Sequence, residues 1–135
     1  MKTSIIEIEG IGPTSRQKLD KAHISTVEEL LKRGASRTGR KQISENSGID
    51  VETILDWVNI ADLLRLDGID SQLAYLLKLA GVDTIKELRT RNPINLHDKL
   101  IETKENSKTI KVVFSLEMIE DFIEQAKKLK PTIYY

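Results

Sequence analysis

The sequence predicts an all-α fold made of two tandem copies of one unit, packed as one compact domain. Three observations predict it: a gap-free internal repeat, apolar residues at helical spacing, and capping residues at the expected helix starts. A length of 135 residues fits one compact domain or two small repeats that share a core. A hydrophobic fraction of 39% is sufficient for a packed interior, so we do not expect a disordered chain.

The internal repeat is visible when the chain is aligned with itself at an offset of 58 residues. Residues 8–33 then match residues 66–91 without a gap. The identical pairs include Gly10 with Gly68, Ile11 with Ile69, Thr26 with Thr84 and Arg33 with Arg91. So many matches in so short a window indicate one unit written twice.

A second match, between the segments that follow Asp50 and Ser115, needs an offset of 65 residues. Copy two therefore carries a short insertion near residues 107–114. We expect repeat 1 over residues 1–65, repeat 2 over residues 66–130 and a C-terminal tail over residues 131–135.

Each copy is expected to contain a turn followed by four helices, whose starts are marked by proline or by N-capping residues. In copy one these are Pro13 after Gly12, a capping box at 25–28 opened by Ser25, Ser36 for a helix to about Ser47, and Asp50. In copy two the corresponding N-caps are Asp70, Asp83, Asn95 and Ser115. Trp57 and Phe122 stand at matching positions and are expected in the core rather than as platforms for stacked bases.

The β-branched run TIKVVF, at residues 109–114, is typical of a short strand or of an extended connector. Residues 2–9 are the one candidate strand that could pair with it. We expect a connector.

Composition excludes several kinds of site. The chain contains no cysteine, which rules out disulfides and thiolate metal sites. Its first residues include acids and no apolar run long enough for a signal peptide, and no segment approaches the roughly 18 apolar residues of a membrane span. We expect a cytoplasmic protein with no membrane partner and no small-molecule substrate.

The charges balance overall but are unevenly distributed. Lys and Arg number 21, as do Asp and Glu, and this balance disfavours a dedicated nucleic-acid binder. Residues 1–44 hold nine bases against five acids, whereas residues 45–74 hold one base against seven acids.

The segment IEGIGP, at residues 8–13, places two glycines around an apolar residue directly before a helix. Glycine permits positive φ and lets another molecule approach the backbone closely. The helix start adds unpaired N–H groups and the positive end of the helix dipole, so such a turn can hold a phosphate without any side chain. Ile11 would anchor the turn in the core.

This turn resembles the hairpin of helix-hairpin-helix domains. The whole chain is similar to an uncharacterised bacterial family, a domain of unknown function that contains tandem helix-hairpin-helix repeats. The stretches that carry the resemblance are GIGPTSRQKL, WVNIADLLRLDGID, LLKLAGVDTIKEL, RNPINLHDKL and FIEQAKKL. The resemblance implies two helix-hairpin-helix-like repeats that bind DNA backbone without sequence preference or mediate protein contacts. It implies no cofactor beyond a monovalent cation, which some such domains hold on the carbonyls of the turn.

Residue by residue, the resemblance favours copy one as the nucleic-acid site, although Arg16 stands where the hairpin usually has a small residue. The candidate nucleic-acid-binding residues are Gly10, Ile11, Gly12, Thr14, Arg16, Lys18, Arg37, Arg40 and Lys41. In copy two Gly68 and Ile69 remain, but Asp70 replaces the second glycine. Because Asp70 would cap its helix and repel phosphate, we expect this second hairpin to be structural.

Part of the candidate set belongs to a basic run, KRGASRTGRK at residues 32–41, which contains no acid. Beside the first turn it would form a short basic track for a phosphate backbone. The alternative is an ordinary solvated helix end, where basic residues are favourable.

Catalysis is not expected. His23 and His97 have no cysteine, paired carboxylate or companion histidine at ligand spacing, so neither an active site nor a metal site is indicated. Two hypotheses remain. The first is a non-catalytic protein that contacts nucleic-acid phosphates through the first hairpin. The second is a protein–protein interaction module, a scaffold or homodimer, which an exposed apolar patch at residues 112–114 would favour.

Overall fold

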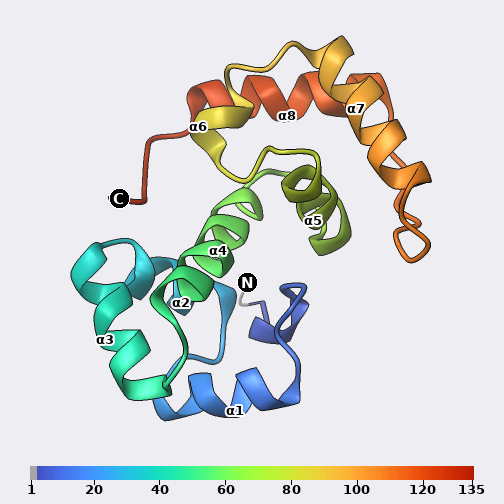
Figure 1. The fold of residues 1–135 in the computed structure, drawn as a ribbon. Coiled ribbons are helices and arrows are strands. Elements are labelled where there is room, and N and C mark those ends of the chain that lie inside the picture. Colours follow the sequence, from blue (N-terminus) through green and yellow to red (C-terminus); the bar gives the residue numbers. More distant parts are fainter. Residues whose placement is uncertain (1–2) are drawn as a thin grey trace. The chain divides into compact units, whose positions relative to one another are not determined.

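The computed structural model describes residues 3–135, and the all-α fold class is confirmed. A short 3-10 helix, η1 (Ile5–Glu7), precedes eight α-helices (Figure 1). These are α1 (Pro13–Lys21), α2 (Val27–Gly34), α3 (Arg37–Ser47), α4 (Val51–Leu63), α5 (Ser71–Leu79), α6 (Ile85–Leu88), α7 (Pro93–Glu105) and α8 (Leu116–Lys128). None of the described helices is long and apolar enough to cross a membrane.

The chain divides into two compact units at the end of α4. Unit 1 ends at Asp62 and also takes up Thr132–Tyr135, whereas unit 2 comprises Leu63–Pro131. Four α-helices follow the Gly-Ile turn of each copy. In unit 1, α1 and α2 both pack against α3; in unit 2, α5 packs against α7, and α6 and α7 pack against α8. That the two copies pack as one domain stays a prediction.

The first turn is anchored in unit 1 by the buried side chains of Ile8 and Ile11, whereas Gly10 and Gly12 are exposed. Ile5, Ile8, Leu19, Leu30 and Ile43 are fully buried in unit 1. In unit 2 the buried stripe of α5 consists of Leu73, Ala74, Leu76 and Leu77, as helical spacing predicts.

Three expected helix starts were wrong by one or three residues. The cap of α2 is Thr26 rather than Ser25, and its Oγ1 accepts the N–H of Glu29 at 3.1 Å. The cap of α6 is Thr84 rather than Asp83. Asn92, not Asn95, caps α7, because Pro93 occupies the first helical position, where a missing N–H costs nothing.

The expected starts at Pro13, Ser36, Asp70 and Ser115 are confirmed. Residues 109–114 form a connector between α7 and α8, and no strand occurs among the described residues. The N-terminal candidate strand does not pair with it. Ser4 instead forms an isolated antiparallel bridge with Thr26, and Lys2 lies outside the described residues.

Candidate functional site

The two Gly-Ile turns have the same backbone. The N–H of Ile11 donates to the carbonyl of Ile8 at 3.1 Å, and the N–H of Ile69 donates to the carbonyl of Leu66 at 3.4 Å. The glycine before each isoleucine has positive φ, +96° at Gly10 and +90° at Gly68. The shared φ explains why both copies require glycine at this position.

A large aromatic side chain lies behind each of these glycines. A Cβ on Gly10 would lie 3.5 Å from Nε1 of Trp57, and a Cβ on Gly68 would lie 3.6 Å from Cε1 of Phe122. Both rings are buried, so they are core residues that support the turns rather than platforms for bases.

Alanine at Gly10 or at Gly68 is expected to destabilise the protein by about 1–2 kcal/mol in each case. The cost comes from the positive φ, because both Cβ positions make ordinary van der Waals contacts. Urea unfolding of the two variants measures it. A much larger loss at only one of the two positions would contradict the equivalence of the turns.

The turns differ at the start of the helix that follows. In the second, the carboxylate of Asp70 accepts the N–H of Leu73 at 2.8 Å. In the first, Gly12 occupies the N-cap position and no side chain caps α1. The other N-caps whose side chains accept a helix N–H are Thr26, Ser36, Thr84, Asn92 and Ser115. Among the α-helices with a described N-cap, α1 alone begins without a side-chain acceptor.

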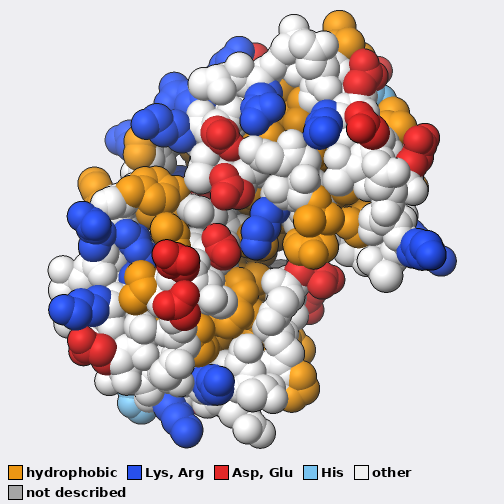
Figure 2. All heavy atoms as spheres, viewed as in Figure 1, with side chains coloured by type: hydrophobic (Ala, Val, Ile, Leu, Met, Phe, Trp, Pro, Cys, Tyr) orange, Lys and Arg blue, Asp and Glu red, His pale blue; other side chains and the backbone are white. Residues whose placement is uncertain are grey.

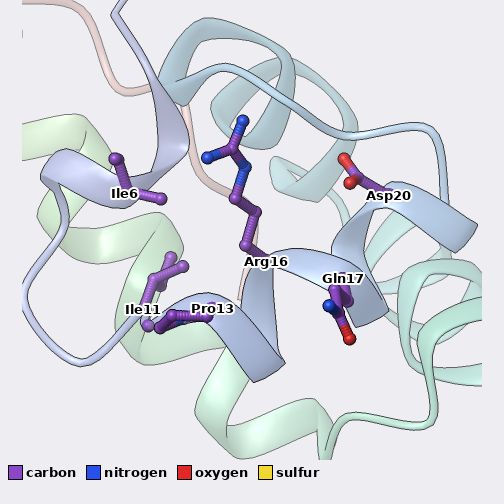
Figure 3. A pocket seen from close by; sticks show the side chains of 7 residues that line it. Ile6, Ile11, Pro13, Arg16, Gln17 and Asp20 are labelled. Carbon is purple, nitrogen blue, oxygen red and sulfur yellow. The ribbon is translucent and has the colours of Figure 1, made fainter.

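An open groove of about 550 Å³ lies beside this uncapped start. Its lining comes from η1, the Gly-Ile turn and the first two turns of α1: Ile6, Ile11, Gly12, Pro13, Arg16, Gln17 and Asp20. In Figure 3, Arg16 and Asp20 extend from the same side of α1, and Ile6 lies across the groove. The carboxylate of Asp20 therefore offsets the charge of Arg16 within the groove. Sequence reasoning missed Ile6, Gln17 and Asp20.

A different face of α1 carries positive charge without acid. Thr14, Lys18 and Lys21 are exposed and follow one another at spacings of four and three residues, so they share one side of the helix. Ile11, by contrast, is buried and anchors the turn as expected.

The structure does not bring the basic run beside the first turn. Figure 1 shows the start of α1, after the turn, and the start of α3, which carries Arg37, at opposite sides of unit 1. Arg37 and Lys41 are exposed on α3. The proposed continuous track was wrong, because α1 places its C-terminal end rather than the turn toward α3.

Arg40 is removed from the candidate interface by burial, with only 3% of its surface exposed. Its guanidinium donates to the carbonyls of Gly34 at 2.9 Å, Ala35 at 3.2 Å and Tyr134 at 2.8 Å. Burial lowers the pKa of Arg40, and the charge interaction with Tyr135 opposes this shift. Arg40 holds the end of α2 and the C-terminal segment together, which no sequence pattern indicated.

Arg33, another member of the basic run at residues 32–41, caps the C-terminal end of α1 with its side chain. Its guanidinium donates to the carbonyls of Ala22 and His23 after α1. Arg91 donates to the carbonyl of Gly81 at 3.3 Å after α5 in the same manner. The matched arginines thus satisfy the open carbonyl end of matched helices.

The histidines have no partner that suggests chemistry. His23 is exposed with φ +62° after α1. The His97 ring packs edge-on against Phe114, with centroids 5.5 Å apart. The described residues contain no group of three or more His, Cys, Asp or Glu that could hold a metal ion.

Charges of both signs cover the face of unit 1 that Figure 2 shows, where Lys and Arg are interspersed with Asp and Glu. The face of unit 1 shown there therefore carries no broad basic surface.

In comparisons with known proteins, one family model, described as Domain of unknown function (DUF4332), matches residues 9–129. No curated protein and no solved structure matches the chain.

Proposed function

We infer the function from the site itself, because the chain belongs to the DUF4332 family, whose function is unknown. We propose a non-catalytic protein that binds the phosphate backbone of nucleic acid without sequence preference. The contact is the first turn, Gly10-Ile11-Gly12, acting as a helix-hairpin-helix motif in a cytoplasmic protein. A monovalent cation on the remaining turn carbonyls belongs to the same proposal.

The observation that supports this function is the uncapped start of α1. The first N–H groups of a helix need an acceptor from outside the helix, and a phosphate oxygen supplies one. Gly12 has no side chain that fills this place, and nothing lies within 4 Å of a Cβ at this position. In the second turn Asp70 already supplies the acceptor and a negative charge, so only the first turn remains for phosphate.

The neighbouring charges suit weak binding. Lys18 and Lys21 extend along α1 on the side away from Asp20, and Thr14 adds a hydroxyl at the helix start. With two or three phosphates contacted, the affinity should fall with a log–log salt slope of about −2 to −3. Arg37 and Lys41 are exposed on α3, whose start lies on the other side of unit 1 from the start of α1 (Figure 1), so they contribute long-range attraction only.

Gly12→Asp gives the first turn the carboxylate that the second turn already has. We expect nucleic-acid affinity to fall at least about tenfold, because the new side chain takes the amides and repels phosphate. Stability should rise by a few tenths of a kcal/mol, since Gly12 has φ −99° and aspartate is a better N-cap. The measurement is fluorescence anisotropy of labelled duplex and single-stranded DNA at low and moderate salt.

Two controls separate the causes. Gly12→Asn caps the same amides without adding charge, so its affinity should lie between the wild type and Gly12→Asp. Thr38→Asp adds the same charge at an exposed position of α3 and should leave the affinity nearly unchanged. An unchanged affinity in Gly12→Asp would exclude the first turn as the contact. An absence of wild-type binding at low salt would exclude nucleic acid as the partner.

A second candidate function, a protein–protein interaction module, is favoured by one observation. Val113, in the connector before α8, has 80% of its surface exposed. A large apolar side chain exposed to this degree is typical of a contact with another protein when further apolar residues adjoin it.

A further inference from the structure

The connector between α7 and α8 leaves backbone groups unpaired. In the part of the chain that the structure describes, Lys111–Phe114 form no backbone–backbone hydrogen bond. Three of these four residues are Val112, Val113 and Phe114, which favour extended conformation. The connector is therefore an open edge to which another extended segment can add.

One face of the connector is fixed to unit 2. Ile110 is buried, and the ring of Phe114 lies 5.5 Å from the ring of His97 and 5.8 Å from Nζ of Lys104, both on α7. Exposure alternates along the segment, with Lys111 and Val113 turned outward and Val112 and Phe114 partly covered. Alternation of this kind is typical of one strand that is held on one face only.

An open groove of about 420 Å³, with both apolar and polar lining residues, adjoins the exposed Val113. It is lined by Ile101, Lys104, Glu105, Ser107, Ile110, Val113 and Phe114. Ile101 is also exposed, so Ile101 and Val113 place two exposed apolar side chains at this groove, next to the unpaired edge.

The charges around the connector are complementary to those of a second copy of the chain in antiparallel orientation. Lys108 and Lys111 lie before or within it, whereas Glu117, Glu120 and Asp121 follow it in the first turns of α8, and all five are exposed. Antiparallel pairing with a second copy brings the lysines of each chain toward the acids of the other. Parallel pairing would place lysines against lysines.

We propose that two copies of this chain associate through antiparallel pairing of Lys111–Phe114, with the Val113 side chains and the adjoining grooves covered. In a two-fold pairing centred on Val113, the two Val113 side chains lie opposite each other, and Lys108 and Lys111 of one copy come toward Glu117 of the other. This interface deepens the second candidate function, protein–protein interaction, and is independent of nucleic-acid binding.

Sedimentation velocity over a series of concentrations tests this interface. The wild type should form a concentration-dependent dimer. Val113→Asp should weaken it at least about tenfold, because a charge would be buried beside the groove. Val51→Asp is the matched control, since Val51 is also an exposed valine, at the start of α4 in unit 1, and its replacement should leave the dimer intact.

A charge exchange tests the antiparallel direction. The double variant Lys108→Glu, Lys111→Glu and the double variant Glu117→Lys, Glu120→Lys should each lose the dimer, because like charges meet across the two-fold axis. Their mixture should form a heterodimer of near wild-type affinity, since every contact is then between opposite charges. Circular dichroism checks that each variant keeps its helices.

Three outcomes would overturn the interface: a wild type that stays monomeric up to the highest concentrations, a dimer insensitive to Val113→Asp, or double variants that fail to associate on mixing. Val113→Asp should bind labelled DNA as the wild type does. Failure of the dimer and failure of the nucleic-acid proposal can therefore be distinguished.

Discussion

Replacement of Gly39 by alanine is expected to destabilise unit 1 by about 3 kcal/mol or more. A Cβ at this position would overlap the backbone carbonyl oxygen of Arg33 at the end of α2 and lie 3.1 Å from Oγ of Ser36. The same Oγ caps α3 by accepting the N–H of Gly39 at 3.0 Å. Because the obstacle is backbone, it cannot be relieved by a side-chain rotation, and the turn between α2 and α3 must open.

Urea unfolding followed by circular dichroism measures this loss. The adjacent Thr38→Ala is the control, because Thr38 is exposed and alanine favours a helix, so its effect should stay within about 0.5 kcal/mol. The loss of stability in Gly34→Ala should lie between those of Gly39→Ala and Thr38→Ala. Its Cβ would lie 2.5 Å from Cγ2 of Val58, but this side chain can move. Equal stability of Gly39→Ala and Thr38→Ala would show that the turn is looser than the structure indicates.

Arg40→Ala is expected to cost about 2–3 kcal/mol. The change removes the donor from three backbone carbonyls, and the bond to the carbonyl of Gly34 is buried. Arg40→Lys should recover only part of this loss, because an ammonium group cannot reproduce the planar geometry of the guanidinium. Arg37→Ala, on the exposed side of the same helix, should change stability by less than about 0.5 kcal/mol.

The loss should also depend on the C-terminal segment. In a chain shortened after Pro131, the contact of Arg40 with Tyr134 is already absent, so Arg40→Ala should cost less than in the full chain. Additive effects of the truncation and the substitution would contradict the proposed link between Arg40 and Tyr134.

Much of the fold could be predicted from the sequence. The helical class, the connector at residues 109–114 and the starts of α1, α3, α5 and α8 could all be predicted, because they depend on local spacing and capping chemistry. The start of α2 was misplaced by one residue because Ser25 and Thr26 are both good caps and both precede a glutamate at capping-box spacing, Glu28 or Glu29. In the structure the N-cap is Thr26, whose hydroxyl accepts the N–H of Glu29 and donates to the carboxylate of the same residue.

The candidate site could be predicted only in part. The repeat aligns Gly12 with Asp70, and this difference predicts that α1 starts without a side-chain cap. The role of Arg40 could not be predicted, because its partners are backbone carbonyls, which leave no sequence signature. The groove was missed because Ile6 reaches α1 from η1, a contact between elements that periodicity does not describe.

Residues 132–135 make unit 1 discontinuous in the chain, and this affects the order in which the protein is completed during translation. The guanidinium of Arg40 bonds to Tyr134 across 94 residues, and Asn59 accepts the hydroxyl of Tyr135 across 76 residues. Contacts that close such long loops form late, and the ribosome delivers the N-terminal helices first. All of unit 2 emerges before Thr132, so the nascent chain can complete unit 2 first. Until residues 132–135 have been synthesised, Arg40 and Asn59 in unit 1 lack their hydrogen bonds to Tyr134 and Tyr135.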